Sequence, residues 1–349
     1  MGVTPWYCTR EQVKAATETV ETARNNARVD IACEAATEAV HQLCRRTFYP
    51  WIGTQYFDWP APTDPSPYRV WTGDLLSVTT LVAGGTTISS GNYFLYPPNA
   101  SRFSEPYRWI ELDKADLPSW ETGDTEQRNI AVTGTWGYTS DTVTAGATAE
   151  ELDASETGVD ISDSSLIGIG DVILVGAEYM VVTGRSLLTS SQTVQTPMTA
   201  SSANTVCAVT TGSAFHAGEM ITLDSERMMV EDVAGNTLIV RRAADGTALA
   251  THTGSTIYAP RTLTVVRGAL GSTAAAHVTS SAITRHRVPS LVNRLAVAEA
   301  VNILLSEESG WARTPGEGVS ARPASGAGLP DLRNAVLIRY GLQAQQGAV

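Results

Sequence analysis

The sequence predicts an α+β protein, in which a small helical bundle with a short antiparallel sheet is interrupted by a large all-β insertion of two nested repeat modules. Three observations lead to this prediction. Apolar residues recur at helical spacing near both ends of the chain. The segment 129–138, NIAVTGTWGY, alternates side chains as a β-strand does. An internal repeat lies between residues 140 and 287.

Length and charge exclude several classes of protein. At 349 residues the chain can hold two or three domains. It contains no apolar stretch of membrane-spanning length, and its start, MGVTPWYCTREQ, lacks the apolar region of a signal peptide. The net charge of -12 argues against a protein that binds nucleic acid by neutralising phosphates. We expect the four cysteines to be reduced and without zinc, because they form no C-x-x-C pair or Cys/His cluster.

Residues 9–47 are predicted to be helical, as two antiparallel helices or as one bent helix. Thr9 and Gln12 have the spacing of a capping box, with Thr9 as the N-cap. The second half of this region places four apolar residues on one stripe: Ile31, Ala35, Ala39 and Leu43. We interpret this alanine-rich stripe as a face packed in the core.

Residues 48–71 combine many aromatic side chains with prolines, which predicts an aromatic loop with short strands. Its aromatic residues include Trp51, Tyr56 and Trp59. They could form a sugar-binding or peptide-binding surface. Alternatively they anchor the loop or are buried at a subunit interface, where Tyr and Trp are enriched.

A β region follows over residues 74–112. We expect strands at 76–82, 93–96 and 109–112, with a Gly-Gly turn at 84–85 and a return strand that begins at 87. The strand 129–138, which contains Trp136 and Tyr138, completes the sheet.

The repeat consists of two front halves followed by two back halves. The sequence GDVILVGAEYMVV at 170–182 matches GEMITLDSERMMV at 218–230, and LIVRRAADGTALATH at 238–252 matches LTVVRGALGSTAAAH at 263–277. Since each module needs one front and one back half, this order predicts nesting. An inner module of about 206–257 then lies inside an outer module of about 160–200 plus 258–287.

Three residue types recur at matched positions of the repeat. The pairs are Glu178 and Glu226, Arg267 and Arg242, and His277 and His252. We expect each glutamate to form a structural salt bridge with a module arginine. The histidines occur once per module, so they should not converge on one metal; the spacing Arg-x3-Gly-x5-His instead suggests a tie between the last strand and the glycine turn.

The C-terminal region is predicted to hold a helix over 288–307, a flexible arm over 309–328 and a short helix over 331–340. The long helix has an apolar stripe of Leu291, Leu295, Ala298, Val301 and Leu305. The tripeptide Arg285-His286-Arg287 precedes it and could meet DNA phosphate or an acidic partner, although three surface charges can also be merely solvated.

The sequence contains no convincing catalytic set. G-x-S-x-G, the P-loop, H-E-x-x-H and a G-x-G-x-x-G after a strand are all missing. We therefore expect no enzymatic activity, no cofactor and no bound metal.

With the insertion removed, the chain resembles the head-to-tail connector (adaptor) proteins of tailed, siphovirus-like phages. The resemblance lies in the helices of 9–48, in LLSVTTLVAGGTTISSGNYFLYP at 75–97, in VTGTWGY at 132–138 and in VPSLVNRLAVAEAVNILLSEE at 288–308. These segments cover about half of the chain. The repeat modules, with GNTLIVRRAADGT at 235–247, look like the β insertions of connectors from actinobacterial phages.

The resemblance implies a structural virion protein at the neck, assembled in the host cytoplasm. It implies a ring of twelve copies that docks under the portal protein, links the capsid vertex to the next neck or stopper protein and forms part of the channel for double-stranded DNA. An acidic lumen would let DNA slide without sequence-specific binding. The implied adaptor core is 1–139 plus 288–349, with 140–287 as the β insertion, and no membrane is involved.

Twelve residues are candidates for the interfaces of such a ring: Trp51, Tyr56, Trp59, Trp136, Tyr138, Arg285, Arg287, Trp311, Arg313, Arg333, Arg339 and Tyr340. Two other readings stay open. The chain could be another neck or tail structural protein, a stopper or tail terminator, although such proteins are expected to be mostly β. It could also be a carbohydrate-binding virion module that uses the aromatic loop and the repeated β modules.

Overall fold

The computed structural model describes residues 4–17, 22–60, 66–116, 119–121, 123–308 and 328–342. The protein is mostly β, with 38% strand and 24% helix, and its strands form antiparallel sheets of six and ten strands. The expected small helical bundle with a short sheet is therefore wrong. The strands extend far beyond their apolar segments, because ladder hydrogen bonds need only backbone groups and tolerate the Ser- and Thr-rich stretches.

The chain divides into two compact units. One unit comprises Arg46–Asp141 and Leu270–Ser272, and the other comprises Met1–Arg45, Thr142–Ala269 and Thr273–Val349.

The first unit holds the six-stranded sheet, in the order β1-β6-β2-β5-β4 with β3 paired to β2. Its strands are β1 (Trp51–Phe57), β2 (Arg69–Ala83), β3 (Thr86–Ile88), β4 (Tyr93–Tyr96), β5 (Tyr107–Leu112) and β6 (Ile130–Trp136). Alternate residues of β6, from Ile130 to Trp136, are buried in a core that also takes in Leu75, Leu81 and Ile110. The region 48–71, expected to be an aromatic loop with short strands, thus contains the strand β1 and the start of β2.

The second unit holds the ten-stranded sheet, in the order β11-β14-β13-β12-β15-β10-β9-β16-β7 with β8 paired to β15. Its strands are β7 (Thr142–Ala147), β8 (Gly158–Asp160), β9 (Val172–Val175), β10 (Glu178–Thr193), β11 (Val206–Ala208), β12 (Met220–Leu223), β13 (Glu226–Ala234), β14 (Thr237–Arg241), β15 (Thr256–Val266) and β16 (Ala282–His286).

Two separate apolar cores lie along this sheet. We call the part around the first core, which includes Ile161, Met180 and Leu263, the outer module. The part around the second core, which includes Cys207, Met228 and Leu238, is the inner module. In the inner module, strands β13 and β14 are joined by a tight turn at Gly235 and Asn236.

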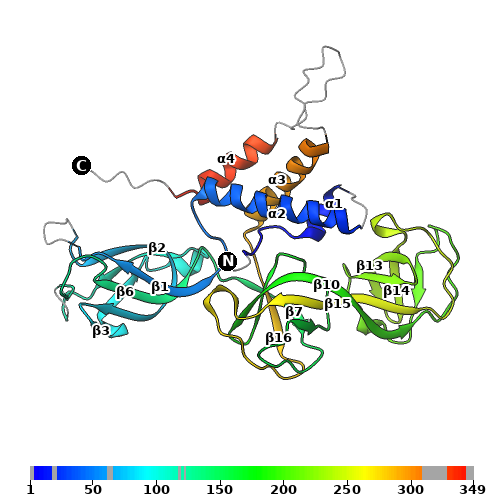
Figure 1. Cartoon of the computed structure of the whole chain (residues 1–349), viewed down its shortest axis with the longest axis horizontal. Coiled ribbons are helices and arrows are strands. Elements are labelled where there is room, and N and C mark those ends of the chain that lie inside the picture. The colour runs from blue at the N-terminus through cyan, green and yellow to red at the C-terminus, as the bar shows by residue number, and fades with distance from the viewer. Residues whose placement is uncertain are drawn as a thin grey trace, which may run out of the picture. The chain divides into compact units, whose positions relative to one another are not determined.

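The outer module has the same hairpin, made by β10 and β15, but its strands continue past the matched position. Ser186 pairs with Thr262 where Ala234 pairs with Thr237 in the inner module. The inner module occupies the end of this long hairpin, as Figure 1 shows. In the outer module, the whole inner module thus takes the place of a turn. The matching position within the inner module holds only the two-residue turn of Gly235 and Asn236.

Four helices are found in the described part of the chain: α1 (Arg10–Thr17), α2 (Ala23–Cys44), α3 (Ser290–Glu308) and α4 (Gly328–Tyr340). The capping box is confirmed: the Thr9 amide donates to the Gln12 side chain at 3.1 Å, and the Gln12 amide donates to Thr9 Oγ1 at 3.2 Å. Helices α2, α3 and α4 pack against one another and form what we call the helical layer (Figure 1).

The buried face of α2 is not the predicted one. Ile31 is 62% exposed and Ala39 is also exposed. The core is reached instead by a neighbouring stripe of small residues: Val29, Ala32, Cys33, Ala36, Val40 and Cys44. On α3, likewise, Leu304 is buried while Leu305 of the predicted stripe is 51% exposed. Each helix carries apolar residues on more than one side, and the position of its neighbours decides which side is covered.

Candidate interaction surfaces

Each module is built around one buried glutamate. In the outer module, Arg267 donates from Nε and Nη2 to the two oxygens of Glu178, at 2.7 and 2.9 Å. The amides of Gly268 and Ala275 donate to the same carboxylate at 2.9 and 3.1 Å. His277 Nε2 lies 2.8 Å from Glu178 Oε2. The structural salt bridge expected for Glu178 is confirmed.

The inner module repeats this network bond for bond. Arg242 donates to both oxygens of Glu226 at 2.7 and 2.8 Å, and His252 Nε2 lies 3.0 Å from Oε2. The amides of Ala243 and Ala250 donate to the carboxylate at 3.0 and 2.9 Å. The expected salt bridge of Glu226 is confirmed as well. Each glutamate therefore binds the arginine and the histidine of the back half that the nested arrangement assigns to its own module.

Each of the two arginines also holds a loop of its own module. Arg267 Nη1 donates to the carbonyls of Asp153 and Glu156, both at 2.8 Å. Arg242 Nη1 donates to the carbonyls of Thr199 and Asn204, at 3.0 and 3.2 Å. Every donor of these guanidinium groups is thus directed at the module's own chain, which indicates a structural rather than a binding role.

The two buried glutamates are ionised because each carboxylate accepts several hydrogen bonds. Burial alone would raise the pKa of Glu178 and of Glu226, but the hydrogen bonds, led by those from Arg267 and Arg242, outweigh burial and lower each pKa to about 2. One difference separates the modules. His252 Nδ1 lies 2.8 Å from Asp224 Oδ2, whereas Gly176 stands at the matched turn position of the outer module.

The chain around the start of α1 is fastened to the outer module. The Trp6 amide donates to the Gly170 carbonyl at 2.9 Å, and the Ile169 amide donates to Glu11 Oε2 at 2.9 Å. The ring of Trp6 leaves no space for a β-carbon at Gly170, so glycine is required there both for this approach and for its φ of 101°.

The loop of the inner module that matches the Gly170 loop contacts a different segment of the chain, at Ser164. Ser164 Oγ donates to Glu219 Oε1 at 2.7 Å, and Arg261 donates to both oxygens of Glu219 at 2.7 Å. Glu219 and the guanidinium of Arg261 are buried. This second buried ion pair joins the inner module to the chain of the outer one.

The basic tripeptide lies at the N-terminal end of α3. Arg285 Nη1 is 3.6 Å from Asp171 Oδ1, and the side chain of Arg287 is exposed. Burial raises the pKa of Asp171 to about 6, against the opposing charge of Arg285 and a hydrogen bond from the Gly168 amide. A cavity of about 160 Å³ opens beside Arg285 and Asn293. A carboxylate thus already faces this basic cluster.

The six-stranded sheet carries a row of aromatic rings that the sequence analysis did not single out. Trp71 on β2 faces Trp109 on β5, and Trp109 faces Tyr96 on β4. The ring centroids are 4.8 and 5.5 Å apart. The guanidinium of Arg69 lies over both tryptophans, 5.7 and 4.9 Å from their centroids. Rings that are opposite each other across three strands can be recognised only once the register is known.

The predicted aromatic residues lie apart from this row. Trp51 is half-buried and stacks on Trp136, with centroids 6.0 Å apart. Trp59 is also half-buried, and its Nε1 donates to the Trp120 carbonyl at 3.1 Å. Tyr56 is exposed, with the guanidinium of Arg128 over its ring.

Two further predicted residues lie in the core of the first unit. Trp136 is 1% exposed, and its Nε1 donates to the Gly53 carbonyl at 2.9 Å. Tyr138 is buried as well and packs against Phe48, with the guanidinium of Arg46 over its ring. Both therefore support the sheet and reach little solvent.

Of the predicted residues near the C-terminus, Trp311 and Arg313 lie outside the described residues. Arg333 on α4 donates to both oxygens of Glu299 on α3, at 2.5 and 2.7 Å, and so fastens α4 to the helical layer. Arg339 is exposed, with its guanidinium over the ring of the half-buried Tyr340.

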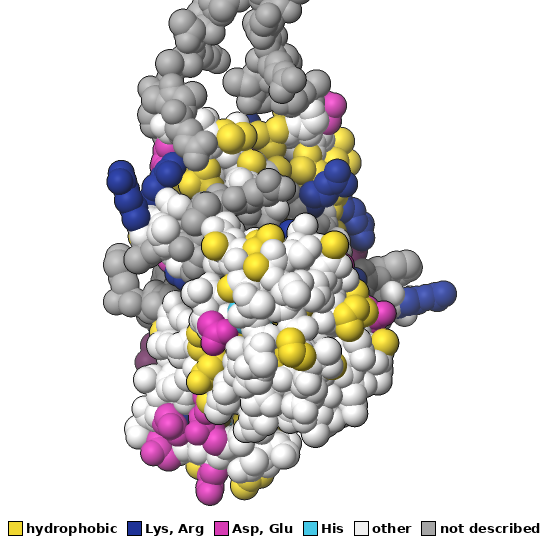
Figure 2. Space-filling model, turned by 90° about the vertical axis from the view of Figure 1, so that its right-hand side faces the viewer, with side chains coloured by type: hydrophobic (Ala, Val, Ile, Leu, Met, Phe, Trp, Pro, Cys, Tyr) yellow, Lys and Arg dark blue, Asp and Glu magenta, His cyan; other side chains and the backbone are white. Residues whose placement is uncertain are grey.

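The helical layer exposes large aliphatic side chains that the sequence analysis assigned to the core or passed over: Ile31, Leu305, Leu337 and Ile338. In Figure 2, hydrophobic side chains gather over the helices above the inner module, flanked by Lys and Arg. The sequence signal for this exposed surface was that α3 and α4 carry more apolar residues than can be buried against one neighbouring element. Exposed aliphatic groups on paired helices are typical of surfaces that bind other proteins.

Within the described residues, no group of three or more His, Cys, Asp or Glu side chains is placed to hold a metal ion. No helix in the described ranges has the length and apolarity needed to cross a membrane. Comparison of the chain with protein-family models, with curated proteins and with solved structures found no match.

Proposed function

We propose that the protein is a structural virion protein, the head-to-tail adaptor of a tailed phage. Copies form a ring that docks under the portal and connects it to the next neck protein, and double-stranded DNA passes through the ring without sequence-specific binding. The net charge of -12 is compatible with a channel along which DNA slides.

The observation that carries this proposal is the helical layer. The segments that resemble adaptor proteins, 9–48 and 288–308, are far apart in sequence, and their helices α2 and α3 pack together. Asn293 of α3 donates to the Tyr7 carbonyl and to Gln12 Oε1, at 2.7 and 2.9 Å, which fastens the start of α1 to α3. The layer then exposes aliphatic residues such as Ile31 and Ile338. A scaffold with exposed apolar helices suits repeated assembly better than catalysis.

A second candidate is a stopper or tail terminator, which would also be a neck or tail structural protein. The strand content of 38% favours it, since proteins of these kinds are expected to be mostly β. It differs from the adaptor in what it binds, because it would contact the adaptor or the tail rather than the portal.

Electron microscopy of the protein mixed with the portal ring of its own phage tests the adaptor proposal. We expect a second ring stacked coaxially on the portal, whose copies can be counted in end-on views. Portals that remain bare while the protein binds isolated neck or tail complexes would overturn the adaptor proposal and support the second candidate.

A further inference from the structure

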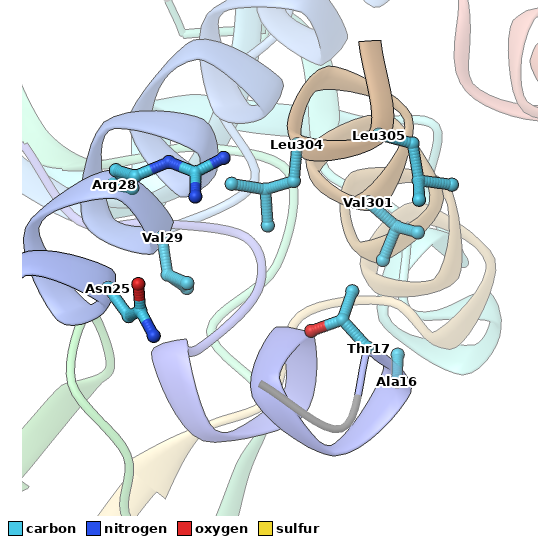
Figure 3. Close-up of a pocket in the computed structure, with 8 residues that line it drawn as sticks. All are labelled: Ala16, Thr17, Asn25, Arg28, Val29, Val301, Leu304 and Leu305. Atoms are coloured by element: carbon cyan, nitrogen blue, oxygen red, sulfur yellow. The ribbon is translucent and has the colours of Figure 1, made fainter. Parts of the chain in front are cut away.

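A cavity of about 270 Å³ that is lined by both apolar and polar side chains opens between α1, α2 and α3, as Figure 3 shows. Its apolar lining consists of Ala16, Val29, Val301, Leu304 and Leu305. Arg28 also lines it and pairs with Glu307 at 3.5 Å, which places charged groups at the border. We call this cavity the helical pocket. Its apolar walls suit aliphatic side chains, and the partly exposed carboxylate of Glu307 can pair with a cation that arrives beside them.

The C-terminal half of α4 presents side chains of that kind. Ile338 is 77% exposed, more than any other large hydrophobic side chain in the described residues, and Leu337 next to it is 44% exposed. Arg339 follows directly and is exposed. Val336 is buried, and Arg333 binds Glu299, so α4 is held in place by the side that lies opposite Ile338.

The pocket and this end of α4 lie at opposite ends of α2. Arg28, which lines the pocket, is in the first turns of α2, and the Leu342 amide just after α4 donates to the carbonyl of Cys44, the last residue of α2, at 3.0 Å. The helix between Arg28 and Cys44 is about 24 Å long. Ile338 therefore cannot fill the pocket of its own chain.

We propose that Leu337 and Ile338 of one copy insert into the helical pocket of the next copy, with Arg339 directed at Glu307 on its border. The surfaces in contact differ, so the association is head to tail, and repetition of one such contact closes into a ring when the rotation allows. The inference deepens the proposed function, on which it rests for the ring itself, by naming the contact between copies.

Cysteine cross-linking tests the contact directly. A chain with both Leu305→Cys and Ile338→Cys should give a ladder of disulfide-linked oligomers on oxidation, since the four native cysteines are buried. Each single variant should stop at dimers. A double variant that gives no more than the singles would overturn the proposal.

Charge substitutions provide a second test, by sedimentation velocity. Ile338→Asp and Leu305→Asp should each weaken self-association at least tenfold, whereas Val278→Asp, a change to the same residue at an exposed site of the outer module, should not. Because Leu305→Asp keeps an intact α4 and Ile338→Asp keeps an intact pocket, a mixture of the two should form one-to-one dimers and nothing larger. Self-association unchanged in both variants would contradict the contact.

The two proposals fail separately. A coaxial ring on the portal without the covalent ladder would leave the adaptor function standing and remove the proposed contact. A covalent ladder with bare portals would support the contact and remove the adaptor function.

Discussion

Arg242 donates from Nε and Nη2 to the two oxygens of Glu226, at 2.7 and 2.8 Å, with both side chains almost completely buried. Arg267 and Glu178 form the same bidentate pair in the outer module. Such pairs are specific in geometry, and loss of one partner leaves an uncompensated charge in the interior. The pairs therefore dominate the response of the modules to mutation and to pH.

Glu226→Ala should reduce the free energy of unfolding by about 3–5 kcal/mol, because it leaves the buried Arg242 without its carboxylate. Urea denaturation followed by circular dichroism measures this. Glu231→Ala is the matched control in the same module, because its pair with Arg241 is exposed and 3.9 Å long. That change should cost less than about 1 kcal/mol. Equal effects of the two changes would show that the buried network contributes no more than a surface pair.

Acid should weaken both modules over a defined range. The pKa values of Glu178 and Glu226 are depressed from 4.5 to about 2 in the folded protein. Their contribution to stability is therefore complete above about pH 4.5 and is lost as pH falls toward 2. Thermal midpoints across this range should fall more steeply for the wild type than for a Glu178→Gln/Glu226→Gln variant. Parallel curves would contradict the prediction.

Asp171 should have the opposite effect. Its folded pKa is raised from 3.8 to about 6, so protonation favours the folded state and stability declines as pH rises from 3.8 to 6. Asp171→Asn should raise the free energy of unfolding at pH 8 by roughly 1–3 kcal/mol, an advantage that disappears in acid. Chemical denaturation at pH 8 and in acid measures this change in the free energy of unfolding. Asp116→Asn, at an exposed site, is the control. A variant less stable than the wild type at pH 8 would contradict the sign.

Residues 187–261 should be dispensable for the outer module. The core of that module contains no residue from this range, and the core of the inner module lies wholly within it. We expect a chain in which Gly-Asn joins Ser186 to Thr262, copying the Gly235-Asn236 turn, to keep a cooperative thermal transition. A chain that joins the same residues by Pro-Pro is the control, because that turn cannot close the hairpin. Loss of cooperativity in the Gly-Asn chain would show that the outer module depends on the inner one.

Gly134→Ala should destabilise the six-stranded sheet. A β-carbon at Gly134 would lie 2.0 Å from the Ser77 carbonyl oxygen, so strand β6 or β2 would have to move, at a cost of about 1–3 kcal/mol. Gly158→Ala in β8 meets no atom within 4 Å and should be neutral to within about 1 kcal/mol. Chemical denaturation of the two variants compares them, and equal midpoints would contradict the prediction.

Local signals in the sequence were sufficient for the helix start at Thr9 and for the Glu–Arg pairs of the repeat. A capping box involves residues three positions apart, and its bonds form wherever the helix begins. The repeated pairs can also be recognised in the sequence, because Glu178 and Glu226 occupy the same position of the two front halves. Arg267 and Arg242 likewise occupy the same position of the two back halves. A carboxylate and a guanidinium that recur together indicate a common structural pair.

The sequence by itself thus determined the positions of the helices, the cap and the repeated ion pairs. Only the tertiary structure decided which face of α2 is buried, because the Ile31 stripe and the neighbouring Ala32–Ala36–Val40 stripe are both apolar, and the place of α3 selects between them. The extent of the sheets was decided in the same way. The repeat predicts that residues 160–200 join residues 258–287, but no pattern within Glu178–Thr193 specifies how far its pairing with Thr256–Val266 extends, because backbone hydrogen bonds hold these long strands together.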